Sequence, residues 1–173
     1  GVVLKNQFIL APRVIVCAGY ETTGLLENLG INLNIIPNRG VVLVSEKVPF
    51  KLNKKLMGAN FGNSKKNNVS LCIEQSLEGN LLIGSSHELG VVSRVVSPQL
   101  ISNIASNALS VYPSIKDISI IRVFTGIRPH CEEGPFFRQI EGYKGLYVAS
   151  GHGGMGITLA PWAGYSMAEM IVN

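Results

Sequence analysis

The residues best suited to chemistry lie near the end of the chain, in the stretch SGHGGMGIT from Ser150 to Thr158. Four glycines fall within six positions there, between a short apolar run and an apolar-periodic segment that predicts a helix. Glycines at a helix start leave backbone N–H groups bare, and the helix dipole adds roughly half a positive charge. A simple turn would need fewer glycines, so the stretch predicts a site for a flat or negatively charged group.

The spacing Gly151-x-Gly153-x-x-Gly156 also matches the fingerprint of dinucleotide-binding proteins. That fingerprint needs a strand before it, a helix after it, a second parallel strand, and an acidic residue about 20 positions further on. The sequence predicts the first two features but reaches Asn173 without the others, and no lysine follows Gly156 to make a phosphate loop. We therefore expect these glycines to contact a ligand through something other than its pyrophosphate.

Arg128, in the segment TGIRPH, is the second residue that could bind a ligand. It ends an apolar strand and is followed by Pro129, so its planar guanidinium would lie in partly apolar surroundings, where it suits a carboxylate. An ordinary salt bridge to Glu132, Glu133 or Glu141 is the alternative. The residues alone leave both interpretations open.

The histidines and cysteines carry weaker signals. His87 and His130 are expected to be polar surface or turn residues, whereas His152 lies inside the glycine stretch and either lines the site or does not. The three cysteines are widely spaced and odd in number: Cys17, Cys72 and Cys131. They form neither a disulfide framework nor a metal-site spacing, so no metal is expected and a reducing, cytoplasmic location is the default. Cys131 is expected to be a plain buried thiol.

Two elements near the start of the chain could position these residues. The continuous apolar run RVIVCAG, residues 13–19, is typical of a strand buried on both faces of a parallel sheet. A short helix follows, with Thr22 or Thr23 as its N-cap and Gly30 as its stop. Before them, Val2–Leu4 and Phe8–Leu10 predict a small hairpin.

The rest of the chain predicts strands interrupted by two helices. The strands are expected over 35–49, 68–75, 80–86, 118–129 and 145–150, with a hairpin turn at Glu78-Gly79. One helix begins with Ser97 as N-cap and Pro98 at its first position, and the other spans Ile157–Val172. This order predicts an α+β fold with an α/β element, in which the two ends form one layer and the middle interrupts it.

Composition excludes several functions. With 46% hydrophobic and 15% charged residues the chain is globular, and no apolar run reaches the about 18 residues of a membrane span. The net charge of +4 is scattered. The one basic cluster comprises Lys51, Lys54, Lys55, Lys65 and Lys66. It lies in an Asn- and Gly-rich stretch poor in stacking aromatics, which indicates a solvated loop and not a nucleic-acid site.

Five segments, in this order, carry a resemblance to a known family: RVIVCAG, PNRGVVLVSEKVP, GNLLIGSSHELG, RVFTGIRPHCEEG and GLYVASGHGGMGITLAPWAGYSMAEMI. Together they resemble the D-amino-acid-oxidase-like flavoproteins, in particular the branch of glycine and sarcosine oxidases and amino-acid dehydrogenase β-subunits. The resemblance covers nearly the whole chain, and its C-terminal stretch is the most specific part. Two departures from the family are Tyr20-Glu21, where Trp and Ser are frequent, and Cys131 to Gly134, where Thr-Pro-Asp-Gly is common.

The resemblance implies that the chain is the C-terminal portion of such an enzyme. Residues 1–34 and 128–173 would belong to an FAD-binding, Rossmann-like domain, and residues 35–127 to a largely antiparallel substrate-binding domain with one helix. Arg128 would pair with the substrate carboxylate. The residues expected near the flavin are Ala18, Gly19, Arg39, Gly40, Gly151, His152, Gly153, Gly154, Met155, Gly156, Ile157 and Thr158.

The implied activity is oxidation of an amino acid or secondary amine to an imine, by hydride transfer to noncovalently bound FAD. No catalytic acid or base is singled out. The implied partners are the small substrate, the N-terminal half of the same enzyme and a second, electron-accepting subunit, and this portion alone is expected to be inactive. The alternative is a substrate-binding or assembly module that lacks its own cofactor site.

Overall fold

The computed structural model describes residues 1–59 and 68–172, and Lys65 and Lys66 of the basic cluster lie outside these ranges. The chain divides into two compact units. Unit 1 comprises Gly1–Pro37 and Arg128–Asn173, and unit 2 comprises Asn38–Ile127. The family resemblance implies these boundaries at 34/35 and 127/128.

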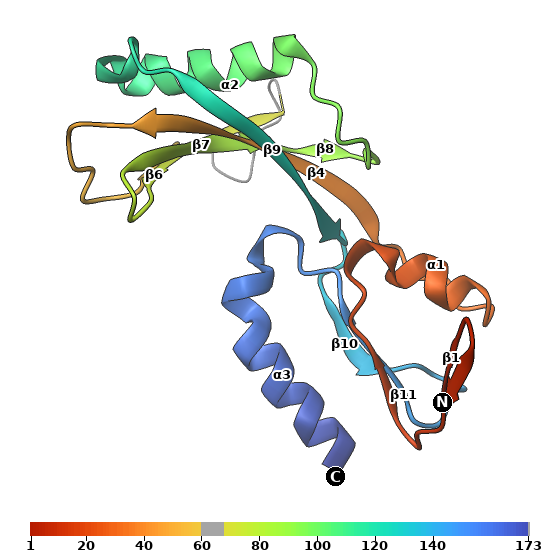
Figure 1. Ribbon diagram of the computed structural model, residues 1–173. Helices are drawn as coiled ribbons and strands as arrows, with labels where there is room; N and C mark the ends of the chain where they lie inside the picture. The colour runs from red at the N-terminus through yellow and green to blue at the C-terminus, as the bar shows by residue number, and fades with distance from the viewer. Residues whose placement is uncertain (60–67, 173) are drawn as a thin grey trace. The chain divides into compact units, whose positions relative to one another are not determined.

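Unit 2 is an antiparallel sheet with one helix on its face (Figure 1). Its strands are β4 (Ile36–Lys47), β5 (Leu56–Met57), β6 (Val69–Gln75), β7 (Asn80–Ser86), β8 (Glu88–Leu89) and β9 (Ile120–His130). The first two residues of β4 and the last three of β9 belong to unit 1. The order is β5-β6-β7-β4-β8, with β9 also paired to β4. The helix α2 (Pro98–Val111) packs on β6 and β7.

The core of unit 2 follows from the alternation of its strands. Val41 and Leu43 of β4 and Ile73 of β6 are completely buried, and they meet Ile104 from the apolar face of α2. The predicted start of this helix is confirmed, because the Ser97 side chain accepts a hydrogen bond from the Leu100 N–H at 3.3 Å. The predicted β6–β7 hairpin is confirmed as well, with Gly79 at a φ of +98° in its turn.

Unit 1 contains a small mixed sheet in the order β10-β11-β3, with β3 parallel to β11. Its strands are β3 (Val14–Val16), β10 (Phe136–Gln139) and β11 (Leu146–Ser150), beside a separate hairpin of β1 (Val2–Leu4) and β2 (Gln7–Ile9). The helix α3 (Gly156–Val172), which contains Pro161, packs against β10, and α1 (Thr22–Glu27) follows β3 (Figure 1).

Three details differ from the sequence-based expectations. β3 is parallel to β11 as predicted, but among the described residues it is not buried on both faces, because Ile15 is 43% exposed. Neither threonine caps α1: a 3₁₀ turn precedes the helix, so its N-cap is Glu21, and the Thr23 hydroxyl donates instead to the Leu33 carbonyl at 2.9 Å. The short strands β5, β8 and β10 were not predicted.

Two further observations concern the described residues only. Cys17, Cys72 and Cys131 are all free thiols. None of the helices within residues 1–59 and 68–172 combines the length and the apolarity needed to cross a membrane.

Candidate functional site

Two glycines of the stretch are required by backbone conformation. β11 ends at Ser150, a 3₁₀ turn occupies Gly153–Met155, and α3 begins directly after it. Gly151 and Gly153 have φ values of +87° and +56°, which residues other than glycine rarely adopt. Gly151 is also tightly packed, because a Cβ there would lie 3.2 Å from the Cβ of Cys131.

Gly154 has no such internal reason to be glycine. It carries no positive φ, and a Cβ there would come no closer than 3.8 Å to any neighbour, the Cδ of Arg128. The residue is exposed, as are Met155 and Ile157, the latter by 94%. The fold would therefore accept a Cβ at this position, and the backbone of Gly154 is exposed beside Arg128.

The carboxyl ends of β3 and β11 are joined at this place. The buried Ser150 hydroxyl donates to the Gly19 carbonyl at 2.7 Å, and Gly19 has a φ of +60°. Ala18 and Gly19 are therefore held next to the start of the glycine stretch. Crevices at the carboxyl ends of parallel strands are the usual ligand sites of such sheets, which is where the sequence-based interpretation expects a ligand.

Arg128 lies in the same unit, half-buried beside Gly154. Burial lowers the pKa of its guanidinium from the ordinary value, because the charged form loses hydration. An arginine nevertheless keeps its charge in proteins. Its planar fork can donate two parallel hydrogen bonds, which is the geometry that a carboxylate accepts.

His152 is the titratable residue of the glycine stretch, and its side chain is partly buried. Within the described residues its buried Nε2 has no hydrogen-bond partner, and its ring stacks on Phe137 with centroids 6.4 Å apart. Its backbone pairs with that of His130 in an antiparallel bridge. Burial lowers the pKa of His152 from its ordinary value, because desolvation disfavours the imidazolium.

This lowered pKa predicts a pH effect on stability. Below the ordinary histidine pKa of about 6.5, the unfolded chain binds a proton that folded His152 resists, so His152 makes the protein less stable as the pH falls. Replacing it with glutamine should make the free energy of unfolding fall less between about pH 7.5 and about pH 5.5. Urea titrations of the two proteins at both pH values check this, and equal losses would contradict it.

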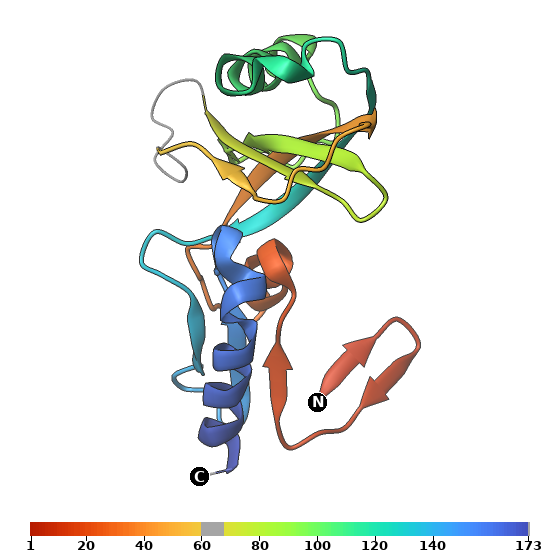
Figure 2. The same cartoon turned by 90° about the vertical axis from the view of Figure 1, so that its left-hand side faces the viewer.

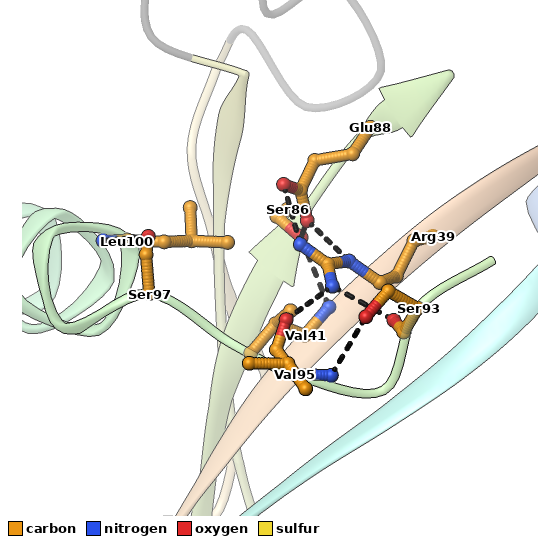
Figure 3. A network of polar contacts seen from close by, with 8 residues as sticks. All are labelled: Arg39, Val41, Ser86, Glu88, Ser93, Val95, Ser97 and Leu100. Carbon is orange, nitrogen blue, oxygen red and sulfur yellow. Dashed lines mark hydrogen bonds and ion pairs between the residues drawn. The ribbon is translucent and has the colours of Figure 1, made fainter. Parts of the chain in front are cut away.

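Arg39 and Gly40 lie in unit 2, and Arg39 is the centre of a buried polar network (Figure 3). Its Nε and Nη2 donate to the two carboxylate oxygens of Glu88, both at 2.8 Å. Its Nη1 donates to the carbonyls of Ser93 and Val95 at 2.8 and 2.6 Å. The hydrogen bond to Glu88 raises the pKa of Arg39. A cofactor contact for Arg39 and Gly40 stays a prediction, and in this structure the guanidinium ties β4 to β8 and to the chain leading into α2.

Sequence reasoning missed a cavity of about 590 Å³ in unit 1. β3 and β11 line it on one side and α3 on the other, with Ala160, Ala163 and Gly164 among its small lining residues. The available signal was the small residues of α3 at helical spacing, which predict close packing of that helix but do not say against what.

Comparison with known proteins identifies the family. The FAD dependent oxidoreductase family matches residues 1–170, so the chain belongs to this family of flavin-dependent enzymes. The chain is 28% identical over 174 residues to one subunit of the opine oxidase of Agrobacterium tumefaciens (strain Ach5), covering 99% of this chain and 43% of that protein. It is 29% identical over 163 residues to glycine oxidase of Geobacillus kaustophilus (strain HTA426), covering 93% and 41%.

The solved structures agree with the fold and with the resemblance to glycine oxidases. The crystal structure of glycine oxidase from Geobacillus kaustophilus superposes with a TM-score of 0.80 at 27% identity, over 92% of this chain and 41% of that one. Glycine oxidase from Bacillus cereus ATCC 14579 gives a TM-score of 0.83 at 24% identity, over 96% and 44%. The chain thus spans less than half the length of these relatives.

Proposed function

We propose that this chain is the C-terminal portion of an FAD-dependent oxidoreductase that oxidises an amino acid or a secondary amine to an imine. The observation that supports this most is that the half-buried Arg128 lies beside the bare backbone of Gly154, just before α3. One group suits a carboxylate, and the other suits a flat ring that gains negative charge.

The residues present fit FAD at its ring end. The cradle consists of Gly153 and Gly154, where side chains would take the place of a ring, and of the first N–H groups of α3. FAD, held noncovalently, would supply the hydride acceptor. The α3 dipole and the N–H groups near Gly153–Ile157 would stabilise negative charge as it develops beside them.

Arg128 would act on the substrate. Its guanidinium would hold the carboxylate of an amino acid and so fix the position of the neighbouring C–H bond, which lowers the entropic part of the barrier. An amine that binds in its neutral form needs no proton acceptor for this step, and we assign no catalytic acid or base to the chain.

The two units would have separate tasks. Unit 1 would complete the FAD-binding domain, together with the N-terminal half of the enzyme, and unit 2 would belong to the substrate-binding domain. Because two relatives are each named as one subunit of an opine oxidase, we also propose a second, electron-accepting subunit as a partner. The 173 residues alone would be inactive.

Gly154→Val gives a direct test of the ring contact. A Cβ at this exposed position meets no close neighbour, whereas a flavin laid against the backbone would meet it, so we expect FAD affinity of the full-length enzyme to fall about 30-fold, as for an overpacked site. Gly24→Val is the matched control, since Gly24 is exposed, carries no positive φ, and a Cβ added there would meet no neighbouring atom within 4 Å. Titration of the apoprotein with FAD measures both, and equal affinities would contradict the contact.

The reaction is tested with the purified full-length protein. It should carry a flavin absorbance spectrum that glycine, sarcosine, proline or a D-amino acid bleaches under anaerobic conditions. A colourless protein that still binds one of these amines would instead support the alternative of a binding module without a cofactor.

A further inference from the structure

The last residues of β9 lie along the glycine stretch. A Cβ added to Gly154 would lie 3.8 Å from the Cδ of Arg128, and a Cβ added to Gly153 would lie 3.8 Å from the Nδ1 of His130. Arg128 and His130 are two positions apart on this strand, so their side chains leave the same face of it. Figure 2 shows this end of β9 beside the start of α3. Two basic side chains therefore border two consecutive glycines of unit 1.

His130 is held at this place by its backbone, which pairs with that of His152 in an antiparallel bridge. The sequence-based interpretation expected a surface or turn residue, whereas His130 is the last residue of β9 and is partly buried. Within residues 1–59 and 68–172, neither of its ring nitrogens takes part in a hydrogen bond or an ion pair. The ring of His130 can therefore bind a ligand without giving up a contact inside the protein.

The other charged or titratable groups near this end of β9 differ from His130 in kind or in surroundings. Arg128 keeps its charge, because a guanidinium is not deprotonated in proteins. Burial lowers the pKa of His152 and so favours its neutral form. Glu132 and Glu133 are exposed, so water and salt screen their charges. Histidine is the side chain whose charge ordinarily changes near neutral pH, which makes His130 the group of this set suited to answer a nearby charge with a proton. Within the described residues the other members of the set are Arg128, Cys131, Glu132, Glu133, Arg138 and His152.

We infer that the His130 imidazole lies against bound FAD and takes up a proton when the FAD is reduced. The inference rests on the proposed function, in which a flavin ring lies on the backbone of Gly153 and Gly154. A ring atom in the place of the Gly153 Cβ would lie 3.8 Å from the Nδ1 of His130, which is van der Waals contact. Arg128, which borders Gly154, keeps its proposed task of holding the substrate carboxylate.

The charges of the reaction give His130 this task. Hydride transfer breaks the substrate C–H bond, and the nitrogen lone pair forms the new C–N bond of the imine. The hydride carries two electrons and one proton to FAD, so one negative charge appears beside the glycine stretch. An opposite charge within about 4 to 6 Å favours the charged form of a titratable group. The imidazole of His130 would therefore take one proton from the solvent, and the reduced enzyme would hold one proton more at this residue than the oxidised enzyme.

Potentiometric titration of the full-length enzyme at several pH values counts these protons. In the wild type, reduction of bound FAD by two electrons should take up about two protons between about pH 7 and about pH 8.5. In His130→Gln it should take up about one, so the midpoint potential should fall with pH about half as steeply as in the wild type. A wild-type enzyme that takes up one proton overturns the inference, whatever the variant does.

Two further variants separate the charge of His130 from its place in the fold. His130→Lys keeps a positive charge that does not change near neutral pH, so its pH slope should match that of His130→Gln. At pH 7 the preference for reduced over oxidised FAD should fall about 10-fold in His130→Gln and much less in His130→Lys. His152→Gln examines the neighbouring histidine. If this variant takes up one proton and His130→Gln still takes up two, the proton belongs to His152 and the inference is wrong.

Flavin content and anaerobic bleaching by an amine, measured on the same preparations, keep the two proposals apart. An enzyme that an amine bleaches, but that takes up one proton for two electrons, refutes only the role of His130. A flavoprotein that no amine bleaches, but that takes up two protons on chemical reduction, refutes only the amine oxidation. A colourless protein refutes both.

Discussion

Replacing Arg128 with alanine in the full-length enzyme is expected to raise the KM for amino-acid substrates about 100-fold, equivalent to about 2.7 kcal/mol. The guanidinium is half-buried, so its hydrogen bonds to a carboxylate would be little weakened by water. The KM for a simple amine without a carboxylate should change much less, because that substrate has no group for Arg128 to bind. Steady-state kinetics on one substrate of each kind measures the difference.

Arg122→Ala is the matched control for this prediction. Arg122 lies on the same strand, β9, but is exposed, and its loss should leave both KM values within about 2-fold of wild type. Arg128→Lys should recover part of the affinity, since it keeps the charge and loses the planar fork. An equal rise in KM for amino acid and simple amine would show that Arg128 supports the fold of the site and not the carboxylate.

Arg39→Met is expected to lower the free energy of unfolding by about 3 to 5 kcal/mol, the usual cost of breaking a buried ion pair on one side. The Arg39 side chain is only 7% exposed, and it holds Glu88 together with two backbone carbonyls. The variant leaves the Glu88 carboxylate without its cation and both carbonyls without their donor. Urea unfolding of the full-length enzyme measures the loss.

The exposed salt bridge between Lys55 and Glu74 supplies the comparison. Lys55 and Glu74 are 2.9 Å apart, close to the 2.8 Å of Arg39 and Glu88, but their side chains are 47% and 44% exposed. Lys55→Met should therefore cost at most about 1 kcal/mol. Losses of similar size for the two variants would mean that burial does not govern the Arg39 pair.

Local chemistry made part of the fold predictable. The start of α2 could be read directly because a serine cap and a proline at the first helical position act on their immediate neighbours. The β6–β7 hairpin was equally local, since Gly79 supplies the positive φ that its turn needs. The glycine stretch was correctly expected between a strand and a helix for the same reason.

Features that depend on distant residues could not be predicted. The Arg39 network joins β4 to positions about 50 residues further along, and nothing near Arg39 in the sequence indicates Glu88 as its partner. β10 is too short to show a periodicity, and its pairing with β11 forms it. Gly151 is required by the backbone and Gly154 is not, and this difference is visible only in their φ angles and in the atoms around each Cα.

The interruption of unit 1 by unit 2 has a consequence for how the chain folds. Unit 2 is contiguous, whereas β3 and β11 lie in segments that all of unit 2 separates. Closing so long a loop costs conformational entropy before the contacts of the parallel pair can stabilise the chain. Such pairings therefore form late. During synthesis we expect unit 2 to fold while Gly1–Pro37 is still without its partner strand β11. The Ser150–Gly19 hydrogen bond would form after unit 2 has folded. The candidate site would then exist only in chains that have been translated as far as α3.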